Sequence, residues 1–559
     1  MWKNIFPSLQ WIKGYSFQYF RNDAVSGLTL AAYAIPVSMA YATLAGLPPQ
    51  YGIYGYLIGG LFYAIFGTGM QLAVGPTSAI SLLIGTTIAT MANGDIQRWA
   101  DIASLTALIV AGISILAYFF KLNSIINFIS ESVLLGFKAG AAITIALTQL
   151  PKLFGVKGGG SGFSERISVL LSQVPGTNLT VLIFGLVALI LLIASEKIFP
   201  GRPVAIVLVI ASIILISTTS LINSGFSVTG FMPPGLPELH LPSFRMPDID
   251  GVIPLAFACF LLMYIESVSA AKTLAQEGGY EINPRQELLA LATANLATAF
   301  GQGYPVSGGL SQSAVNKNAG ARTPLSLVFA SAAIALCLLF LTGPIKNLPD
   351  VMLASILLVA ISSLVDIKSL KRLWKVSRVE FTVALLALSG VIVFGILKGV
   401  ILAAVASIVL MIREVSDPHI AFLGRIPGTK RYTDIGRHPD NETIPGVLLF
   451  RVEASVLYFN VENIRNHVWK EILNKEDSLK AVIWDMSTSP YVDIAGAKLI
   501  KRLYTELNAK GISLKIAEAH AGVRDILRLE EIEDILGHIS RKISVDDLVN
   551  ELVASDQTH

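Results

Sequence analysis

The sequence predicts a polytopic α-helical membrane protein that carries a small α/β domain near its C-terminal end. Of the 559 residues, 53% are hydrophobic and only 14% are charged, whereas soluble domains are about one quarter charged. Apolar runs of about twenty residues, the length that crosses a hydrocarbon core of about 30 Å, recur through most of the chain. The charged residues concentrate before residue 25, at 365–380 and after 412.

The apolar runs predict about fourteen membrane spans. The basic cluster from Lys368 to Arg378 is expected on the cytoplasmic side by the positive-inside rule, and the Pro-rich loop 225–254 on the outside. An even number of spans puts both termini in the cytoplasm of a multi-pass cell-membrane protein. Clear spans are expected to begin near residues 25, 52, 103, 130, 179, 203, 252, 325, 381 and 396, and less regular ones near 74, 286, 308 and 350.

The pattern changes from about Pro445. GVLLFRVEASVLYFN, AVIWDM and ISLKIAEA are typical of buried strands, and amphipathic helical segments alternate with them. This alternation predicts a partly parallel sheet in a cytoplasmic α/β domain. The expected organisation is a cytoplasmic N-terminal segment at 1–22, a membrane domain at 23–412, a linker at 413–444, the α/β domain at 445–553 and a tail at 554–559.

Two segments interrupt the apolar pattern at corresponding places in the two halves, QLAVGPTSAISLLIG at 71–85 and YPVSGGLSQSAVNKNAG at 304–320. Secondary transporters place substrate sites at such broken segments, and non-helical backbone is tolerated at membrane depth only inside protein or beside a cavity. The free N–H groups that open two half-helices form an anion site. An alternative is that the small residues only serve close helix packing. The predicted site residues are Thr77, Ser78, Gly309, Leu310, Ser311 and Gln312.

One acidic residue, Glu266, lies in an apolar segment that has no other charge back to Gly251. An ionisable residue at membrane depth indicates a functional site. Because burial disfavours the charged form of a carboxyl group, we expect Glu266 to accept a proton near neutral pH. The alternative is an acid at a helix end that faces water or pairs with another span. Glu131 and Lys138 are expected to form a structural pair of this kind.

Several classes of function are not supported by the sequence. The net charge of +3 gives no case for nucleic-acid binding. Cys259 and Cys337 both lie inside apolar runs, which argues against a disulfide framework or a cysteine-based metal site. The sequence lacks a recognisable nucleophile–base pair, metal-ligand cluster or phosphate-binding loop. We therefore expect no enzyme activity, no cofactor and no metal.

The interrupted segments and their neighbours resemble the SulP anion permeases, a family that includes animal solute-carrier sulfate transporter relatives and plant sulfate transporters. The resemblance rests on DAVSGLTLAAYAIPVSMAYATLAGLPPQYGIYG, LAVGPTSAISLLIG, ISESVLLGFKAGAAITIALTQLPKLFGV and GGYEINPRQELLALATANL. VIWDMSTSPYVDIAGAKLIKRLYTEL resembles a STAS domain. Together these blocks cover nearly the whole chain. The family implies a UraA-like fold of fourteen spans, in two inverted seven-span repeats with core and gate domains.

The resemblance also implies a function: secondary active transport of an inorganic anion, foremost proton-coupled sulfate uptake by an elevator-type movement. It implies a homodimer that forms through the STAS and membrane domains. Val37 and Tyr41 join the substrate-binding residues predicted above, and Glu266 matches the acid that is linked to proton coupling in proton-driven members. Sodium coupling is not favoured, because Ala270 stands where sodium-driven bicarbonate relatives place an oxygen ligand.

Two residues depart from the family pattern. Many members have Gln at the position of Val37, and many have Arg at the position of Gln312. Two half-helix ends supply roughly +1 of charge in total, which balances a monoanion but leaves a sulfate dianion about one charge short. Either the substrate is a monoanion such as bicarbonate, or a proton on Glu266 removes a competing negative charge as sulfate binds.

Alternative functions stay open at this point. Bicarbonate, chloride and C4-dicarboxylates are alternative substrates, and an exchanger, a passive channel, a nucleobase permease or a signalling scaffold are alternative classes. In the STAS domain, soluble relatives that are switched by phosphorylation carry Ser after an Asp, but here Ile494 follows Asp493. We therefore expect this domain to serve dimerisation and assembly, or to bind a cytosolic partner.

Overall fold

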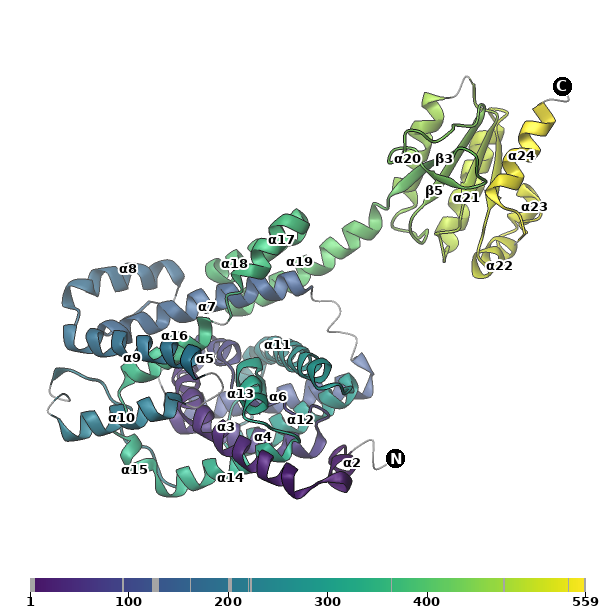
Figure 1. The fold of residues 1–559 in the computed structure, drawn as a ribbon. Helices are drawn as coiled ribbons and strands as arrows, with labels where there is room; N and C mark the ends of the chain where they lie inside the picture. The colour runs from purple at the N-terminus through teal and green to yellow at the C-terminus, as the bar shows by residue number, and fades with distance from the viewer. Residues whose placement is uncertain are drawn as a thin grey trace. The chain divides into compact units, whose positions relative to one another are not determined.

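The computed structural model describes residues 6–92, 95–122, 130–160, 162–199, 204–219, 221, 224–362, 364–475, 478–540 and 542–556. The chain divides into two compact units, Met1–Ser407 and Ile408–His559. The first unit is almost entirely helical and the second is an α/β domain (Figure 1). Residues 1–5 of the expected N-terminal segment and residues 557–559 of the expected tail lie outside the described residues.

The first unit, Met1–Ser407, is called the membrane unit below. Its first half ends with α10. Its long helices begin with α3, which keeps Pro36 inside it. The elements in order are α2 (Ser8–Trp11), η1 (Ile12–Gly14), α3 (Phe17–Leu44), α4 (Pro49–Phe66), β1 (Val74–Gly75), α5 (Ser78–Ala92), α6 (Ile96–Phe119), α7 (Glu131–Phe154), α8 (Phe163–Gln173), η3 (Val174–Gly176), α9 (Leu179–Ile198) and α10 (Val204–Thr218).

The second half repeats the same order. Two long helices come first, then a two-residue strand that leads into a short helix, and then further helices. The elements are α11 (Met246–Gly278), α12 (Pro284–Phe300), β2 (Ser307–Gly308), α13 (Leu310–Asn318), α14 (Leu325–Phe340), α15 (Thr342–Ile345), α16 (Asp350–Ser362), α17 (Ile367–Val376), α18 (Arg378–Phe394) and α19 (Ile396–Ser416).

Helices occur at each of the fourteen places where the sequence predicts a span, but many of them are short. Among the described residues, five helices are long and apolar enough to cross a membrane, or six if the bent pair Phe163–Gly176 and Leu179–Ser195 makes one span. The helix that follows β2, α13, has only 9 residues. The repeated order of elements fits two related halves, and the number of fourteen spans stays a prediction.

Most contacts between helices of the membrane unit fall within two sets, which meet where α3 packs against α10 and α16. The first bundle contains α3, α4, α5, α6 and α11–α14, and the second bundle contains α7, α9, α10, α16 and α18. Small residues allow the closest contacts within each bundle. A Cβ added to Gly27 of α3 would lie 2.4 Å from the Ser326 carbonyl oxygen, and one added to Gly136 of α7 would lie 1.9 Å from the Ala384 carbonyl oxygen of α18.

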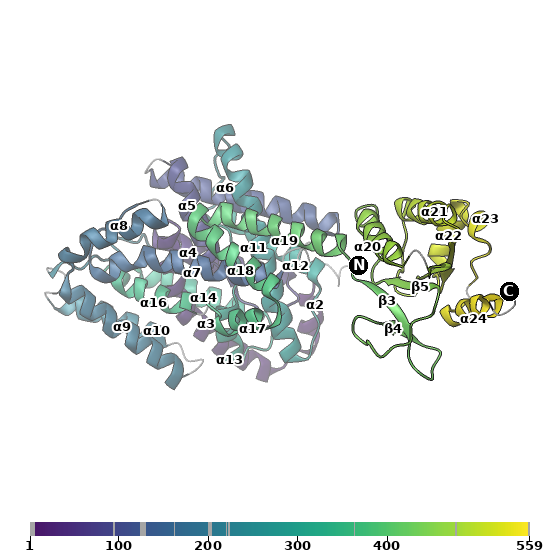
Figure 2. The same cartoon turned by 90° about the horizontal axis from the view of Figure 1, so that it is seen from above.

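The second unit is built on a five-stranded sheet in the order β4-β3-β5-β6-β7. Strands β5, β6 and β7 are parallel, and β3 pairs antiparallel with β5. Helices α20–α22 cover one face and α24 the other (Figure 2). The elements are β3 (Ile420–Arg425), β4 (Tyr432–Asp434), β5 (Val447–Val452), α20 (Val461–Asn474), β6 (Ala481–Asp485), α21 (Ile494–Asn508), β7 (Ser513–Ala517), α22 (Ala521–Leu529), α23 (Glu533–Leu536) and α24 (Val545–Asp556).

The sequence predicts a linker at 413–444, but this stretch contains the strands β3 and β4. Ile420 pairs with Val452 and Phe422 with Phe450, so β3 belongs to the sheet of the α/β domain. The alternation of buried residues in β3 is short and lies among Pro and Gly residues. Its pairing with β5 depends on residues about thirty positions away, which the local pattern cannot indicate.

Helices α20 and α21 are joined by a charged cluster on the second unit. Glu506 Oε1 accepts hydrogen bonds from Arg465 Nη2 at 2.8 Å and from Arg502 Nε at 3.0 Å. Burial raises the pKa of the Glu506 carboxyl group, but the hydrogen bonds and charges of Arg465 and Arg502 outweigh this effect, so its pKa lies below the usual value. The ionised carboxylate therefore stabilises the fold, and this contribution is lost as pH falls through the pKa of the folded state.

We predict that Glu506→Gln lowers the free energy of unfolding of the second unit by about 1 kcal/mol at neutral pH. The difference from the unmodified domain should shrink as pH falls below about 4.3, where the carboxyl group is protonated in the unfolded chain. Urea unfolding of residues 417–559, followed by circular dichroism across this pH range, measures both effects. Glu462→Gln, which removes an exposed partner of Arg502, is the matched control and should change stability less. Equal losses in the two variants would contradict the assignment.

Candidate functional site

The two halves of the membrane unit meet in a two-stranded antiparallel element. Val74 pairs with Gly308, and Gly75 pairs with Ser307. All four residues are buried. Strand β1 leads into α5, which begins at Ser78, and β2 leads into α13, which begins at Leu310. The pairing therefore places the N-terminal ends of two short helices beside each other, one from each half of the chain.

Hydrogen bonds from both halves hold the paired strands β1 and β2, called the crossing of β1 and β2 below, in place. Ala73 N–H donates to Ser313 Oγ at 2.8 Å, and Gly309 N–H donates to the Ala73 carbonyl at 3.2 Å. Gly308 N–H donates to Ser267 Oγ of α11 at 2.8 Å. Backbone at membrane depth has to find its partners within the protein, and these side chains supply them.

The approach to β2 is held in the same way. Asn295 of α12 accepts a hydrogen bond from Val306 N–H at 2.9 Å and donates to the Val306 carbonyl at 3.0 Å. The hydroxyl groups of Ser81 on α5 and Tyr304 share a hydrogen bond of 2.9 Å. The chain before β2 is thus hydrogen-bonded to the helix that follows β1.

Both short helices open with unused backbone donors. In α5 the first helical bond runs from Ser81 N–H to the Thr77 carbonyl at 2.9 Å, and in α13 it runs from Ser313 N–H to the Gly309 carbonyl at 3.0 Å. The three N–H groups before each of these bonds have no acceptor within their own helix. Gly309 differs from the prediction, because its own N–H is bonded to the Ala73 carbonyl.

A cavity of about 320 Å³ lies at these two helix ends. It collects every residue that the sequence and the resemblance point to: Val37, Tyr41, Thr77, Ser78, Glu266, Gly309, Leu310, Ser311 and Gln312. Val37 and Tyr41 come from α3 and are buried side chains of the cavity lining. The volume is far larger than one water molecule and suits a small hydrated ion.

Glu266 lies inside α11, twelve residues before its end, and not at a helix end as one alternative expected. Its Oε2 atom is 3.4 Å from Thr77 Oγ1 and 3.4 Å from Ser307 Oγ, both of which can donate to it. Ser307 Oγ also donates to Thr77 Oγ1 at 3.2 Å. The carboxyl group therefore contacts Ser307 of β2 and Thr77, the residue directly before α5.

Gln312 presents an unpaired amide group. Its side chain is 4% exposed, and its Nε2 atom has no hydrogen-bond acceptor within the described part of the chain. The amide lies over Gly309, where an added Cβ would be 2.5 Å from Nε2. A buried donor without an acceptor is costly. An anion in the cavity is an acceptor that could satisfy it.

Lys138 also lines the cavity, and the sequence interpretation missed this role. The expected pair of Glu131 and Lys138 is absent from the salt bridges found among the described residues. Glu131 instead occupies the exposed first turn of α7. Lys138 is an isolated charge within an apolar helix, and such a charge indicates a functional site. The sequence therefore does carry a signal for this residue. Other residues of the cavity that were not predicted are Tyr33, Ser269, Ala270, Thr273, Ala314, Ala360 and Leu364.

This arrangement defines a class of protein: a membrane transporter with a central site at the ends of two interrupted helices, joined to a separate α/β domain. The chain belongs to the sulfate permease family, whose model matches residues 20–387. A STAS domain model matches residues 438–545. The family and the STAS domain that the sequence motifs resemble are thereby confirmed.

Relatives match along nearly the full chain. Sulfate transporter 1.2 of Arabidopsis thaliana is 31% identical over 575 residues, which cover 98% of this chain and 87% of that protein. Probable sulfate transporter 4.2 of the same plant is 31% identical over 569 residues, covering 98% and 84%. Probable sulfate transporter Rv1739c of Mycobacterium tuberculosis is 29% identical over 531 residues, covering 95% of each chain.

Two solved structures show the same fold. The murine Solute Carrier 26 family member A9 anion transporter in the inward-facing state superposes with a TM-score of 0.90 at 20% identity, covering 98% of this chain and 94% of that one. The transmembrane domain of the cyanobacterium bicarbonate transporter BicA gives a TM-score of 0.61 at 21% identity, covering 70% and 98%. The membrane anion transporter fold with a STAS domain is therefore established for this chain.

We predict that Gln312→Arg strengthens sulfate binding by about tenfold, because a guanidinium group adds one positive charge and paired donors beside the helix ends. Sulfate affinity of the purified protein, measured by calorimetry, tests the change. Gln312→Glu, of similar size and opposite charge, should weaken binding. An unchanged sulfate affinity in a folded Gln312→Arg protein would count against an anion at this position.

Proposed function

We propose that this protein is a secondary active transporter of inorganic anions, and that its main substrate is sulfate, taken up together with a proton. The observation that carries the proposal is the cavity at the ends of α5 and α13. Free N–H groups and the dipoles of two short helices lie at one cavity, which is a common protein solution for binding an anion. The names of the plant and mycobacterial relatives support sulfate as the substrate.

The position of Glu266 supports coupling to protons. An ionised carboxylate in the same cavity repels an anion, and a proton on the carboxyl group removes this repulsion. Protonation would also free Thr77 and Ser307 to turn their hydroxyl groups toward the substrate, because both now lie within reach of Glu266 Oε2. Proton and sulfate would therefore bind with favourable coupling, which favours their transport together.

The packing of the helices supports an elevator-type mechanism. The first bundle supplies both helix ends, the crossing of β1 and β2, and Glu266, so the site can move as one body with that bundle. The second bundle would stay in place. The repeated order of elements and the antiparallel pairing of β1 with β2 support fourteen spans in two inverted seven-span repeats, as core and gate domains.

We place both termini and the STAS domain in the cytoplasm of a cell-membrane protein, with the basic cluster of α17 on the same side. We also propose a homodimer that forms through the STAS and membrane domains. On the second unit, Tyr458, Ile494 and Leu529 are exposed apolar residues that line one shallow pocket. A surface of this kind suits a protein partner or a second copy of the chain.

A second candidate substrate is bicarbonate. Two half-helix ends carry roughly +1 of charge and Lys138 adds +1, so with Glu266 ionised the cavity balances a monoanion, and one protein of the same fold is named a bicarbonate transporter. A C4-dicarboxylate transporter, an anion exchanger and a channel are further alternatives on this scaffold. Glu266 argues against a channel, because a fixed negative charge beside the path opposes free flow of anions.

We predict that the protein in proteoliposomes takes up labelled sulfate, and that an inward proton gradient accelerates the uptake at least several-fold. A panel of sulfate, bicarbonate, chloride and succinate separates the substrates. Sulfate uptake driven equally well by an outward gradient of a second anion would favour an exchanger. Uptake that follows the membrane potential alone would favour a channel.

Glu266→Gln should remove the stimulation by the proton gradient, because the amide cannot take up a proton in this pH range. Glu277→Gln is the matched control, since Glu277 lies on the same helix α11, is exposed, and does not line the cavity. The control should keep the response to the gradient. Sulfate uptake that ignores the gradient in the unmodified protein and survives Glu266→Gln would exclude proton symport.

A further inference from the structure

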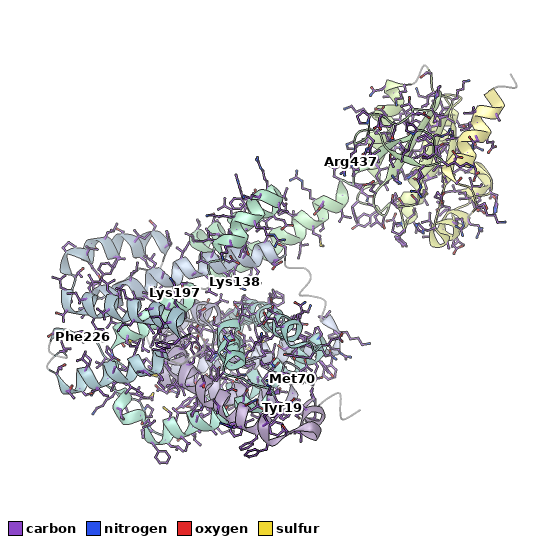
Figure 3. All side chains as sticks on the ribbon, viewed as in Figure 1. Tyr19, Met70, Lys138, Lys197, Phe226 and Arg437 are labelled. Atoms are coloured by element: carbon purple, nitrogen blue, oxygen red, sulfur yellow. The ribbon has the colours of Figure 1, made fainter. Side chains whose placement is uncertain are left out.

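Lys138 brings a positive charge to the cavity from the second bundle. It lies on α7 (Figure 3), which packs against α16 and α18, whereas Thr77, Ser78 and Gln312 belong to the first bundle. The side chain is partly buried. Lys138 and Glu266 are the charged residues among the described residues that line the cavity.

Lys138 is an isolated charge on its helix. Between Glu131 and Lys152, α7 carries no charge other than Lys138. Among the described residues, the salt bridges and hydrogen bonds include none that Lys138 makes. An ammonium group held within a membrane helix is expensive unless it meets an opposite charge. Glu266 lies within electrostatic range of it but not within the 4.0 Å of an ion pair.

The charges in the cavity assign a role to this residue. The two helix ends contribute roughly +1 and Lys138 adds +1, which together match a sulfate dianion when Glu266 carries a proton. With Glu266 ionised, the sum falls to roughly +1 and matches a monoanion. Gln312 supplies a donor but no charge to this sum.

We infer that Lys138 is a substrate-binding residue that determines charge specificity: it supplies, from the second bundle, the positive charge that makes the cavity a site for a dianion. This inference rests on the proposed function. A competing role is that Lys138 only neutralises Glu266. The two roles differ in one respect, because a counter-ion becomes dispensable when Glu266 is replaced by Gln, whereas a ligand of the dianion does not.

The test uses the full chain in proteoliposomes and measures the KM for labelled sulfate and for labelled chloride. Lys138→Gln should raise the KM for sulfate by about tenfold or more and change that for chloride much less. Lys138→Arg, which keeps the charge, should retain the preference for sulfate. Lys152→Gln is the matched control, since it removes a lysine from the same helix about 21 Å along its axis and does not line the cavity.

Two double variants separate the roles. Lys138→Gln combined with Glu266→Gln should still bind sulfate about tenfold more weakly than Glu266→Gln alone. Lys138→Gln combined with Gln312→Arg should regain sulfate affinity, because a charge returns to the cavity from the first bundle. Chloride uptake confirms in each case that the variant is folded.

The inference is overturned if Lys138→Gln behaves like Lys152→Gln, or if its effect disappears in the Glu266→Gln background. It is also overturned if the unmodified protein carries chloride or bicarbonate but not sulfate, an outcome that leaves anion transport intact. If the unmodified protein carries none of these anions, the proposed function fails and the inference fails with it. Loss of chloride uptake together with sulfate uptake in both Lys138→Gln and Lys138→Arg would indicate a structural role and overturn the inference.

Discussion

The membrane unit depends on the antiparallel pairing of Val74–Gly75 with Ser307–Gly308. Each of these segments leaves the helical conformation where no water is available to satisfy its backbone. Each can do so because the pairing, together with Ser267 and Asn295 of the second half, provides the missing partners. The pairing also decides where α5 and α13 begin, and therefore where their free N–H groups lie. One set of backbone hydrogen bonds thus stabilises the break in each half and builds the site.

The sequence indicates the two interrupted segments and the isolated acid because each of them has a local signature. Pro76, Gly308 and Gly309 stand inside otherwise apolar stretches, and Glu266 is an isolated acid in such a stretch. Contacts between distant segments lack a signature of this kind. Thr77 and Ser307 share a hydrogen bond although they are 230 residues apart. For the same reason the local pattern predicts a linker where β3 lies.

Lys138 shows how a local rule can mislead. Seven residues separate it from Glu131, which is two turns of helix, and this spacing favoured a pair along one face. The residues that Lys138 faces are set by the packing of α7 beside the first bundle, which no local pattern contains. Helix α7 can approach α18 closely because Gly136 and Gly140 have no Cβ where they meet the backbone and side chains of α18. The small residues of α7 therefore help to position its charge.

The division of charge between the two bundles has a consequence for transport. An arginine on α13 would travel with the helix ends, so the charge of the site would be constant through a transport cycle. A lysine on α7 belongs to the other bundle, so the sum of charges at the site depends on how the two bundles face each other. If the first bundle moves along the second, the anion leaves Lys138 behind and its affinity falls. In this arrangement, movement itself would favour release of a dianion.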